Sequence, residues 1–215
     1  MRDEVRQRYE ERLPLLQELA ANLERELRRQ FDGVEHVDRI SFRVKSTDSF
    51  LDKVLERRVE PSYDEPLIEV EDQVAGRILV FFLSDVEPAH VQAERLFTPV
   101  EAVQRRPTRY NEFDYESFHA IYGIPPQTKP ARWNERDDLP RTFELQIRTL
   151  FQHSYAEPQH DLAYKPETPP SDEIRRELAW VAASSWGADQ AIERVRLKLA
   201  EGAKVDANAE PGPAR

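Results

Sequence analysis

The sequence contains no cysteine, and this absence removes several classes of chemistry at once. Disulfide bonds, thiolate zinc sites, iron–sulfur clusters and thiol nucleophiles all require cysteine side chains. Glycine is also scarce, with six residues dispersed at positions 33, 76, 123, 187, 202 and 212. They form neither a Walker A phosphate loop nor a dinucleotide-binding fingerprint. Side chains and metal ions would therefore have to hold any bound phosphate group.

Long apolar runs and excess positive charge are absent as well. The longest apolar run, Ile78–Leu83, is far too short to span a membrane, and charge from Arg2 onward leaves no signal-peptide core. We therefore expect a cytoplasmic protein with no membrane association. The 31 Lys and Arg residues are outnumbered by 41 Asp and Glu residues, so the net charge is −10. This balance argues against binding of duplex nucleic acid, but it leaves room for a local basic pocket.

The pattern of apolar residues predicts a single mixed α/β (α+β) domain. Strict alternation over Ile40–Lys45 and Arg141–Thr149 predicts strands with one polar face, and the apolar run within Gln73–Leu83 predicts a strand buried on both faces. Other strands are expected over Pro99–Gln104 and Ser117–Ile124, and helices over 2–30, 46–58, 88–97, 150–165 and 171–199. We expect a mixed sheet of about five strands flanked by helices.

Composition divides the chain into four segments. We expect an N-terminal helical extension over 1–34, the main domain over 35–166, a C-terminal helical region over 167–202 and a disordered tail over 203–215. Pro14 predicts a kink or break in the first helix, and Pro158 and Gly187 are expected to interrupt later ones. Apolar residues from Ile174 to Leu199 recur every three or four positions, as in a coiled-coil seam. We favour packing of this seam against the rest of the chain, and the alternative is a homo-oligomer formed through it.

Charged rows on two of the predicted strands indicate a candidate site. One strand turns Arg43 and Lys45 to a single face, and another turns Glu144, Gln146 and Arg148 to a single face. A single row of this kind is typical of a solvated sheet face. Here, however, arginine and carboxylate groups occur together, which favours a binding site.

A second group of residues extends this candidate site. Asp72 and Arg77 bracket the start of the most buried strand, where a charge needs a partner. Asp72 and Glu144 supply the hard oxygen ligands that hold Mg²⁺ beside substrate phosphates, and arginine forks match phosphate oxygens. Tyr115 and His119 follow an arginine-rich segment of the chain; Tyr115 could stack a base, and His119 could bind phosphate or ribose. The predicted cationic pocket consists of Arg43, Lys45, Lys53, Arg77, Arg105, Arg106, Arg109 and Arg148.

Three further residues, His153, Glu157 and His160, lie on one face of a predicted helix. A metal site there is conceivable but disfavoured, because the sequence offers no fourth ligand and Pro158 lies among the three. We favour a helix that packs beneath the active site.

Five short segments occur in a specific order along the chain. They are Arg43-Val44-Lys45-Ser46 with Ser49 and Lys53, Asp72 with Gly76-Arg77, Tyr115-Glu116-Ser117-Phe118-His119, Phe143–Thr149, and His160 with Tyr164-Lys165. Together they resemble the RelA/SpoT synthetase domain, especially the single-domain small alarmone synthetases, over residues 35–166. The resemblance implies a nucleotidyltransferase-like fold. It also implies transfer of pyrophosphate from ATP to the 3′-hydroxyl of GDP or GTP, the activity of GTP pyrophosphokinases.

The resemblance also implies a role for each residue of the site. Asp72 and Glu144 would be catalytic and would hold Mg²⁺, and Glu144 would ligate the metal or act as general base on the acceptor hydroxyl. Residues implied to bind ATP are Arg43, Lys45, Ser49, Lys53 and Arg77. Residues implied to bind the acceptor are Arg105, Arg109, Tyr115, His119, Gln146 and Arg148.

The chain departs from the family pattern at several positions. Asp114 stands where a Gly usually precedes the stacking Tyr, and Tyr155 and Gln159 replace the usual Trp and Glu. These changes leave the acceptor open, so an adenine nucleotide or the 3′ end of tRNA is an alternative to a guanine nucleotide. The net charge of −10 ranks tRNA lower. A non-catalytic nucleotide-sensing module is a further alternative, which the retained Asp72 and Glu144 disfavour.

Overall fold

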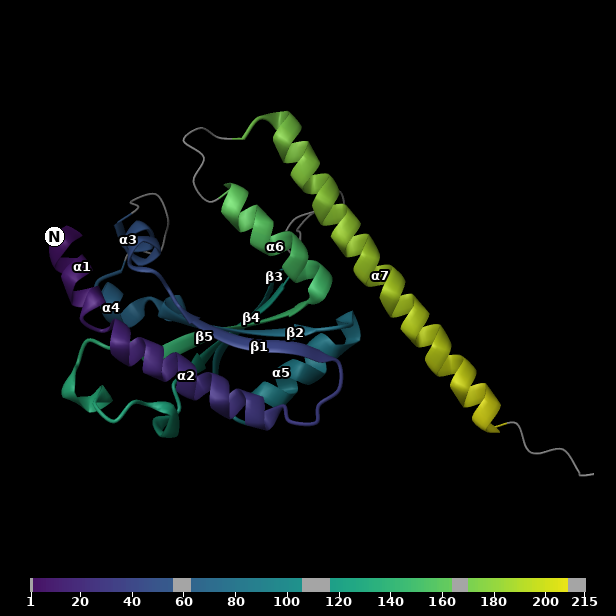
Figure 1. Ribbon diagram of the computed structural model, residues 1–215, viewed down its shortest axis with the longest axis horizontal. Coiled ribbons are helices and arrows are strands. Elements are labelled where there is room, and N and C mark those ends of the chain that lie inside the picture. Colours follow the sequence, from purple (N-terminus) through teal and green to yellow (C-terminus); the bar gives the residue numbers. More distant parts are fainter. Residues whose placement is uncertain (1, 56–62, 106–116, 164–169, 209–215) are drawn as a thin grey trace, which may run out of the picture.

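A five-stranded mixed sheet with helices on both faces forms the centre of the computed structural model, which describes residues 2–55, 63–105, 117–163 and 170–208 (Figure 1). The strand order is β1-β2-β5-β4-β3. Only β2 and β5 pair in parallel among these neighbours, and the other pairs are antiparallel. The strands are β1 (Val37–Val44), β2 (Val74–Val80), β3 (Pro99–Arg105), β4 (Ser117–Gly123) and β5 (Thr142–Thr149). The predicted mixed sheet of five strands is confirmed.

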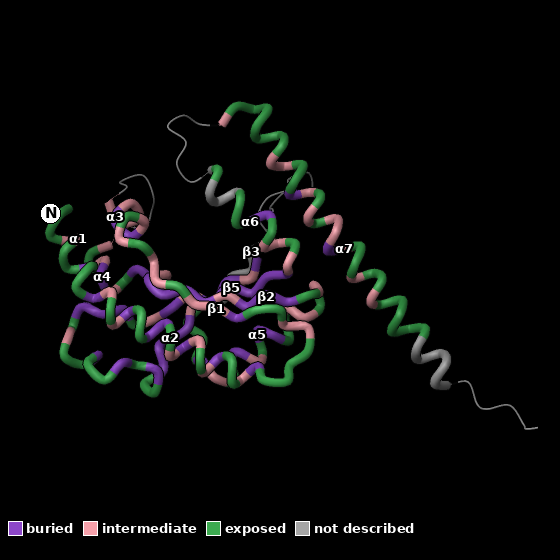
Figure 2. Tube along the Cα trace, viewed as in Figure 1, coloured by how far each residue is buried: buried purple, intermediate pink, exposed green. Residues whose placement is uncertain are grey.

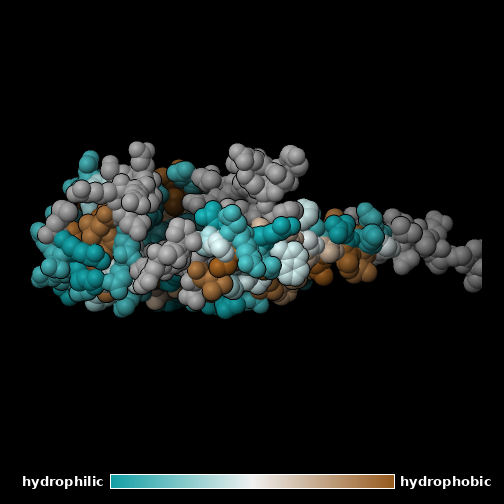
Figure 3. All heavy atoms as spheres, turned by 90° about the horizontal axis from the view of Figure 1, so that it is seen from above, coloured by the Kyte–Doolittle hydropathy of each residue, from teal (hydrophilic) through white to brown (hydrophobic). Residues whose placement is uncertain are grey.

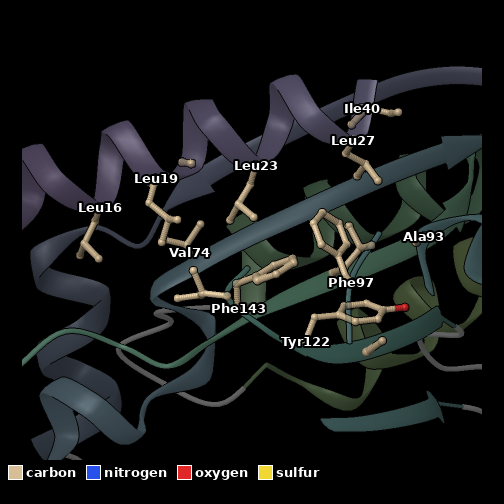
Figure 4. Close-up of a cluster of buried hydrophobic side chains, with 14 of the residues drawn as sticks. Leu16, Leu19, Leu23, Leu27, Ile40, Val74, Ala93, Phe97, Tyr122 and Phe143 are labelled. Atoms are coloured by element: carbon tan, nitrogen blue, oxygen red, sulfur yellow. The ribbon is translucent and has the colours of Figure 1, made fainter. Parts of the chain in front are cut away.

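Helices α2 (Leu13–Gln30) and α5 (Val86–Glu94) cover one face of the sheet (Figure 1). Apolar residues of α2 recur at steps of three and four, and their side chains point toward aromatic rings on the sheet (Figure 4). The fully buried leucines of α2 are Leu16, Leu19, Leu23 and Leu27. The segment expected as an N-terminal extension therefore supplies one side of the main core.

The predicted break in the first helix is confirmed. Helix α1 (Arg2–Glu10) ends before α2 begins, with Glu11 and Arg12 between them. Pro14 falls in the first turn of α2. A proline is tolerated there because the first amides of a helix have no intrahelical acceptor.

The opposite face of the sheet carries α3 (Thr47–Leu55) and α6 (Leu150–Ala163) (Figure 1). Pro158 lies inside α6 without ending it, contrary to prediction. The start of α6 is fixed by a reciprocal pair, in which Gln152 N–H donates to Thr149 Oγ1 and Thr149 N–H donates to Gln152 Oε1. Short elements complete the fold: α4 (Pro66–Glu69), η1 (Glu71–Gln73), η2 (Leu83–Asp85), η3 (Pro126–Thr128) and η4 (Trp133–Glu135).

Helix α7 (Asp172–Asn208) is 37 residues long and crosses the edge of the domain (Figure 1). Asp189 is buried and accepts a hydrogen bond from Thr149 Oγ1 at 2.7 Å, and Arg196 Nη1 contacts Asp85 Oδ1 at 2.9 Å. Both contacts lie C-terminal to Gly187, and on its N-terminal side Ser185 Oγ donates a hydrogen bond to Phe151 O. The domain therefore stabilises the helix on both sides of Gly187, which explains why the predicted break there is absent. The helix also continues past residue 203, where a tail was expected, since the next proline is Pro211.

Much of α7 is exposed to solvent (Figure 2). Its exposed large apolar residues are Ile174, Trp180, Val181, Trp186, Ile192, Val195, Leu197 and Leu199. The expectation that the seam packs within the chain is therefore wrong for its exposed members, which are Ile174, Val181, Ile192, Val195 and Leu199. No helix in the described part of the chain is long and apolar enough to cross a membrane.

Candidate active site

The sheet face opposite α2 carries rows of polar side chains. Residues paired across neighbouring strands lie side by side on one face, since side chains alternate along each strand. One row consists of Arg43, Ala75, Glu144, Ile121 and Glu101, and the next consists of Ser41, Arg77, Gln146 and His119. The register thus brings together charged residues that are far apart in the sequence.

A cavity of about 330 Å³ lies where β1 ends and β2 begins. Lys45 follows β1, Lys53 belongs to α3, and Asp72 belongs to the turn before β2. The full lining is Arg43, Lys45, Lys53, Glu71, Asp72, Glu101, His119, Ile121, Glu144 and Gln146. The structure therefore gathers most of the predicted site residues around one cavity.

Asp72 lies between two lysine side chains in this cavity. Its Oδ2 accepts a hydrogen bond from Lys45 Nζ at 2.7 Å, and its Oδ1 accepts one from Lys53 Nζ at 2.9 Å. Burial raises the pKa of Asp72, but the two ammonium groups outweigh burial and hold this pKa below its ordinary value. Burial lowers the pKa of Lys53, and the charge of Asp72 outweighs it, so this pKa is raised. Carboxylate and ammonium are thus both charged at neutral pH.

Glu144 is held by a neighbour at each of its oxygens. Its Oε1 lies 2.5 Å from His119 Nδ1, and its Oε2 accepts a hydrogen bond from Gln146 Nε2 at 2.9 Å. The side chains of Glu144 and His119 are 13% and 10% exposed. Burial raises the pKa of Glu144, but His119 and Gln146 outweigh it and keep this pKa below its ordinary value. Glu144 is an ionised and oriented carboxylate, as a proton acceptor must be.

The cavity is rich in acidic groups. Four carboxylates, those of Glu71, Asp72, Glu101 and Glu144, line it together with three cationic side chains. Burial and the nearby charge of Glu101 raise the pKa of Glu71, a sign of acidic crowding that a cation would relieve.

The acidic groups suit Mg²⁺ that is only partly coordinated by the protein better than a metal ion whose ligands are all protein side chains. Mg²⁺ takes one or two carboxylates and fills its remaining positions with water and substrate phosphates. Asp72 and Glu144 supply two such carboxylates in one cavity. Within the ranges that the structure describes, no three His, Asp or Glu side chains gather into a cluster able to hold a metal. The donor set therefore suits a metal that shares its shell with a bound nucleotide.

Arg77 and Arg148 lie beneath α6. Glu157 Oε1 lies 2.7 Å from Arg77 Nη2 and 4.0 Å from Arg148 Nη1. His153, one turn earlier in α6, lies 3.4 Å from Arg77 Nη1. Burial and the charge of Arg77 lower the pKa of His153. Glu157 and His153, weighed above as metal ligands, therefore contact arginines, which agrees with the favoured packing role of this helix.

The remaining predicted residues are placed only in part. Ser49 lies in the first turn of α3, the helix that also carries Lys53 of the cavity. Arg105 is the last residue of β3. Arg109 and Tyr115 lie outside the described residues, as does the side chain of His160. Their roles stay predictions.

Three residues of the cavity lining were missed in the sequence. Glu101 is the only acidic residue of the strand predicted over 99–104, and this isolation was an available signal. Glu71 directly precedes Asp72 and was hidden among other acidic residues. Ile121 could be found only from the register, because an apolar residue in a strand points equally well to a core.

The fold and the site segments match known proteins. A family model described as a region found in RelA / SpoT proteins matches residues 42–169. The GTP pyrophosphokinase YjbM of Bacillus subtilis (strain 168) is 26% identical over an alignment of 177 residues, which covers 79% of this chain and 77% of that protein. The crystal structure of small alarmone synthetase 1 from Bacillus subtilis has a TM-score of 0.74 at 21% identity and covers 91% of this chain and 99% of its own. The structure of that synthetase bound to its product pppGpp has a TM-score of 0.70 at 20% identity, with 89% and 97% covered.

Proposed function

Because this chain belongs to the RelA/SpoT family, we propose that it transfers pyrophosphate from ATP to the 3′-hydroxyl of a guanine nucleotide, making a (p)ppGpp-type alarmone. One observation carries the proposal: Asp72 with its two lysines shares a cavity with the Glu144–His119 pair. The first group suits a polyphosphate donor, and the second suits removal of a proton from a hydroxyl group.

The lysine side of the cavity is the proposed donor half. Lys45, Lys53 and Arg43 offer cationic groups to phosphate oxygens, and Arg77 extends this set along the sheet face that carries Arg43. Ser49 lies in the helix that carries Lys53. Asp72 and Glu144 would hold Mg²⁺, which, when bound, neutralises charge on the phosphates during transfer. Fixed cations in a partly buried cavity hold the donor with its β-phosphorus toward the acceptor half.

Glu144 is the proposed proton acceptor. It takes the proton of the acceptor 3′-hydroxyl as the 3′-oxygen bonds to the β-phosphorus of ATP. The bond from that phosphorus to the oxygen bridging the α- and β-phosphates breaks, and AMP leaves with the electron pair. His119 and Gln146 hold the two oxygens of Glu144, so the carboxylate is oriented before the acceptor arrives.

GDP or GTP is the proposed acceptor. Relatives named GTP pyrophosphokinase and a related structure bound to pppGpp support this choice. Contacts to the acceptor are assigned to Arg105, Arg109, Tyr115, His119, Gln146 and Arg148. Asp114, which departs from the family pattern, keeps an adenine nucleotide or a tRNA 3′ end among the outcomes that the experiment must separate.

Transfer of a labelled phosphate tests the proposal. Purified protein is incubated with Mg²⁺, ATP labelled at the γ-phosphate, and GDP, GTP, AMP, ATP or tRNA as acceptor, with Glu144→Gln as the inactive control. We expect label in the GDP or GTP product, one AMP released per transfer, and loss of both with EDTA. Label in an adenine nucleotide or tRNA alone would reassign the acceptor. ATP binding without any transfer would indicate a nucleotide-sensing module.

We also propose that α7 joins this chain to a second copy of itself. Hydrophobic side chains gather along the projecting part of the helix (Figure 3). Ile192, Val195 and Leu199 follow one another at steps of three and four residues, which suits packing against a similar helix. A patch of this kind is rarely left uncovered on a monomer.

A further inference from the structure

Tyr9 and Arg12 form a buried polar corner between α1 and α2. Both side chains are fully buried, and both precede residues 42–169, which the family model matches. Burying a guanidinium group is costly unless it is paired and hydrogen-bonded. The partners of this corner therefore show what it stabilises.

Arg12 contacts the turn that carries Asp72. Its Nη2 donates a hydrogen bond to Gln73 Oε1 at 2.6 Å, and its Nη1 donates to Leu67 O at 2.7 Å and also to Asp138 O. Burial lowers the pKa of Arg12 to about 10, with the charge of Asp138 opposing this effect. Arg12 is thus charged at neutral pH, and its partner Gln73 is the residue that follows Asp72.

The donor-only chemistry of Arg12 fixes the orientation of Gln73. An arginine cannot accept a hydrogen bond, so the Gln73 amide must turn its oxygen to Arg12 and its nitrogen away. That nitrogen donates to Leu67 O at 3.0 Å and to Val70 O at 2.8 Å. Asp72 lies between these anchor points, in a turn with φ −93° and ψ 22°. Arg12 therefore ties both ends of the turn that presents the Asp72 carboxylate.

Tyr9 contacts the other two segments of the donor half. Its hydroxyl donates to Lys45 O at 2.8 Å, and Lys45 N–H donates to Gln73 O at 2.9 Å. The Tyr9 ring stacks on Phe50 of α3, with centroids 4.0 Å apart and planes at 16°. Phe50 lies one turn before Lys53. One corner thus touches the segments of Lys45, Lys53 and Asp72.

We propose that Tyr9 and Arg12 are positioning residues of the ATP-binding half of the active site. They act through the backbone of Lys45, the side chain of Gln73 and the packing of α3, and they set where the two lysines and Asp72 meet. The identity of the ligand as ATP rests on the proposed function. The N-terminal helices then take part in donor binding although they precede the matched family region.

Two conservative variants test this role. Tyr9→Phe keeps the stacked ring and removes only the hydroxyl, and Arg12→Lys keeps the charge but loses the fork that reaches several acceptors. Binding of the non-transferable analogue α,β-methylene ATP with Mg²⁺ is measured by calorimetry. We expect its Kd to rise about fivefold in Tyr9→Phe and about tenfold or more in Arg12→Lys. The KM for ATP should rise in parallel, while the KM for the acceptor stays within about twofold.

Two control variants separate positioning from general destabilisation. Leu23→Ala weakens the core under α2 without touching the corner, and Arg6→Gln removes an exposed contact between α1 and Asp48 of α3. We expect Leu23→Ala to lower the melting temperature, and both controls to leave the analogue Kd unchanged.

Several outcomes would overturn the inference. These are an unchanged Kd in Tyr9→Phe, equal shifts in the KM for ATP and for the acceptor, or the same Kd shift in Leu23→Ala. If Arg12→Lys fails to fold, Tyr9→Phe decides alone. If the wild type binds the analogue but transfers nothing, the proposed function fails, and the Kd comparison still decides the positioning role. A wild type that does not bind the analogue refutes both.

Discussion

Glu144→Gln separates the proposed proton acceptor from the architecture that holds it. The substitution keeps the shape of the side chain and removes its charge. The new amide can turn its oxygen toward Gln146 Nε2 and its nitrogen toward His119 Nδ1, provided that the His119 ring carries its proton on Nε2. Both hydrogen bonds then survive, and a buried charge is removed. We expect the free energy of unfolding to stay within about 1 kcal/mol of wild type.

The effect on catalysis should be far larger than the effect on stability. A positioned general base contributes about 10²- to 10⁴-fold to a rate, so transfer should fall by about that factor. Binding of α,β-methylene ATP should stay measurable, because Asp72, Lys45 and Lys53 are unchanged. The variant therefore is expected to be a folded protein that binds the donor and transfers very slowly.

Three measurements check this expectation: AMP release at saturating substrates, analogue binding by calorimetry, and thermal unfolding. Hydrogen bonds from His119 and Gln146 hold the pKa of Glu144 below its ordinary value, so the wild-type rate should hold as pH falls toward the ordinary glutamate range and drop only below it. Glu87→Gln, the same change at an exposed position in α5, serves as the matched control. A Glu144→Gln rate above about a hundredth of the wild-type rate would refute the assignment, because the loss would then be smaller than the smallest loss expected for a general base.

Other parts of the fold give further expectations. Gly76→Ala would place a Cβ 2.5 Å from Phe42 Cζ, so we expect the free energy of unfolding to fall by about 1–3 kcal/mol and thermal unfolding to occur about 2–12 °C lower; an unchanged melting temperature would mean that the ring moves aside freely. Hydrogen bonding to Arg136 lowers the pKa of Asp138, so this stabilisation is present above the unfolded pKa and is lost as pH falls through the folded one. Arg136→Gln should thus cost about 0.5–1 kcal/mol at neutral pH and little near about pH 2, as urea denaturation can show, and an equal loss at both would contradict the pairing. Val195→Glu, on the exposed face of α7, should reduce the mass measured by light scattering to that of one chain, and a wild type already of that mass would rule out the dimer.

Alternation along the strands made most of the cavity predictable. Arg43 and Glu144 stand in strands whose apolar neighbours face the core, so their polar faces could be identified without coordinates. The pairing of strands was not accessible in this way. Nothing local in Thr142–Thr149 shows that β5 lies between β2 and β4, because strand order depends on contacts between distant segments.

Buried charged side chains were also not predictable from the sequence. Arg12 lies in a charged stretch of an amphipathic segment, where the period of 3.6 residues predicts a solvated side chain. Its partners are two backbone carbonyls and a side-chain amide from two distant segments, one around Leu67–Gln73 and one at Asp138. No pattern within residues 2–30 predicts these partners. The exposed apolar seam of α7 shows a different limit of sequence patterns. Apolar spacing predicts that a helix face is covered, but it does not show whether the same chain or another chain covers it.

The strand order β1-β2-β5-β4-β3 has a consequence for how the protein is made. The residues of β1–β2 and β3–β4 all precede β5 in the chain, so β5 is the last strand to be synthesised and has to enter between β2 and β4. Until it does, β2 and β4 each present an open edge to neighbouring chains, as nascent sheets generally do. Glu144 and Gln146 arrive on that same strand. We therefore expect a ribosome-bound or truncated chain lacking β5 to be prone to aggregation and to lack the proposed proton acceptor, so that the proposed activity begins only when the sheet closes.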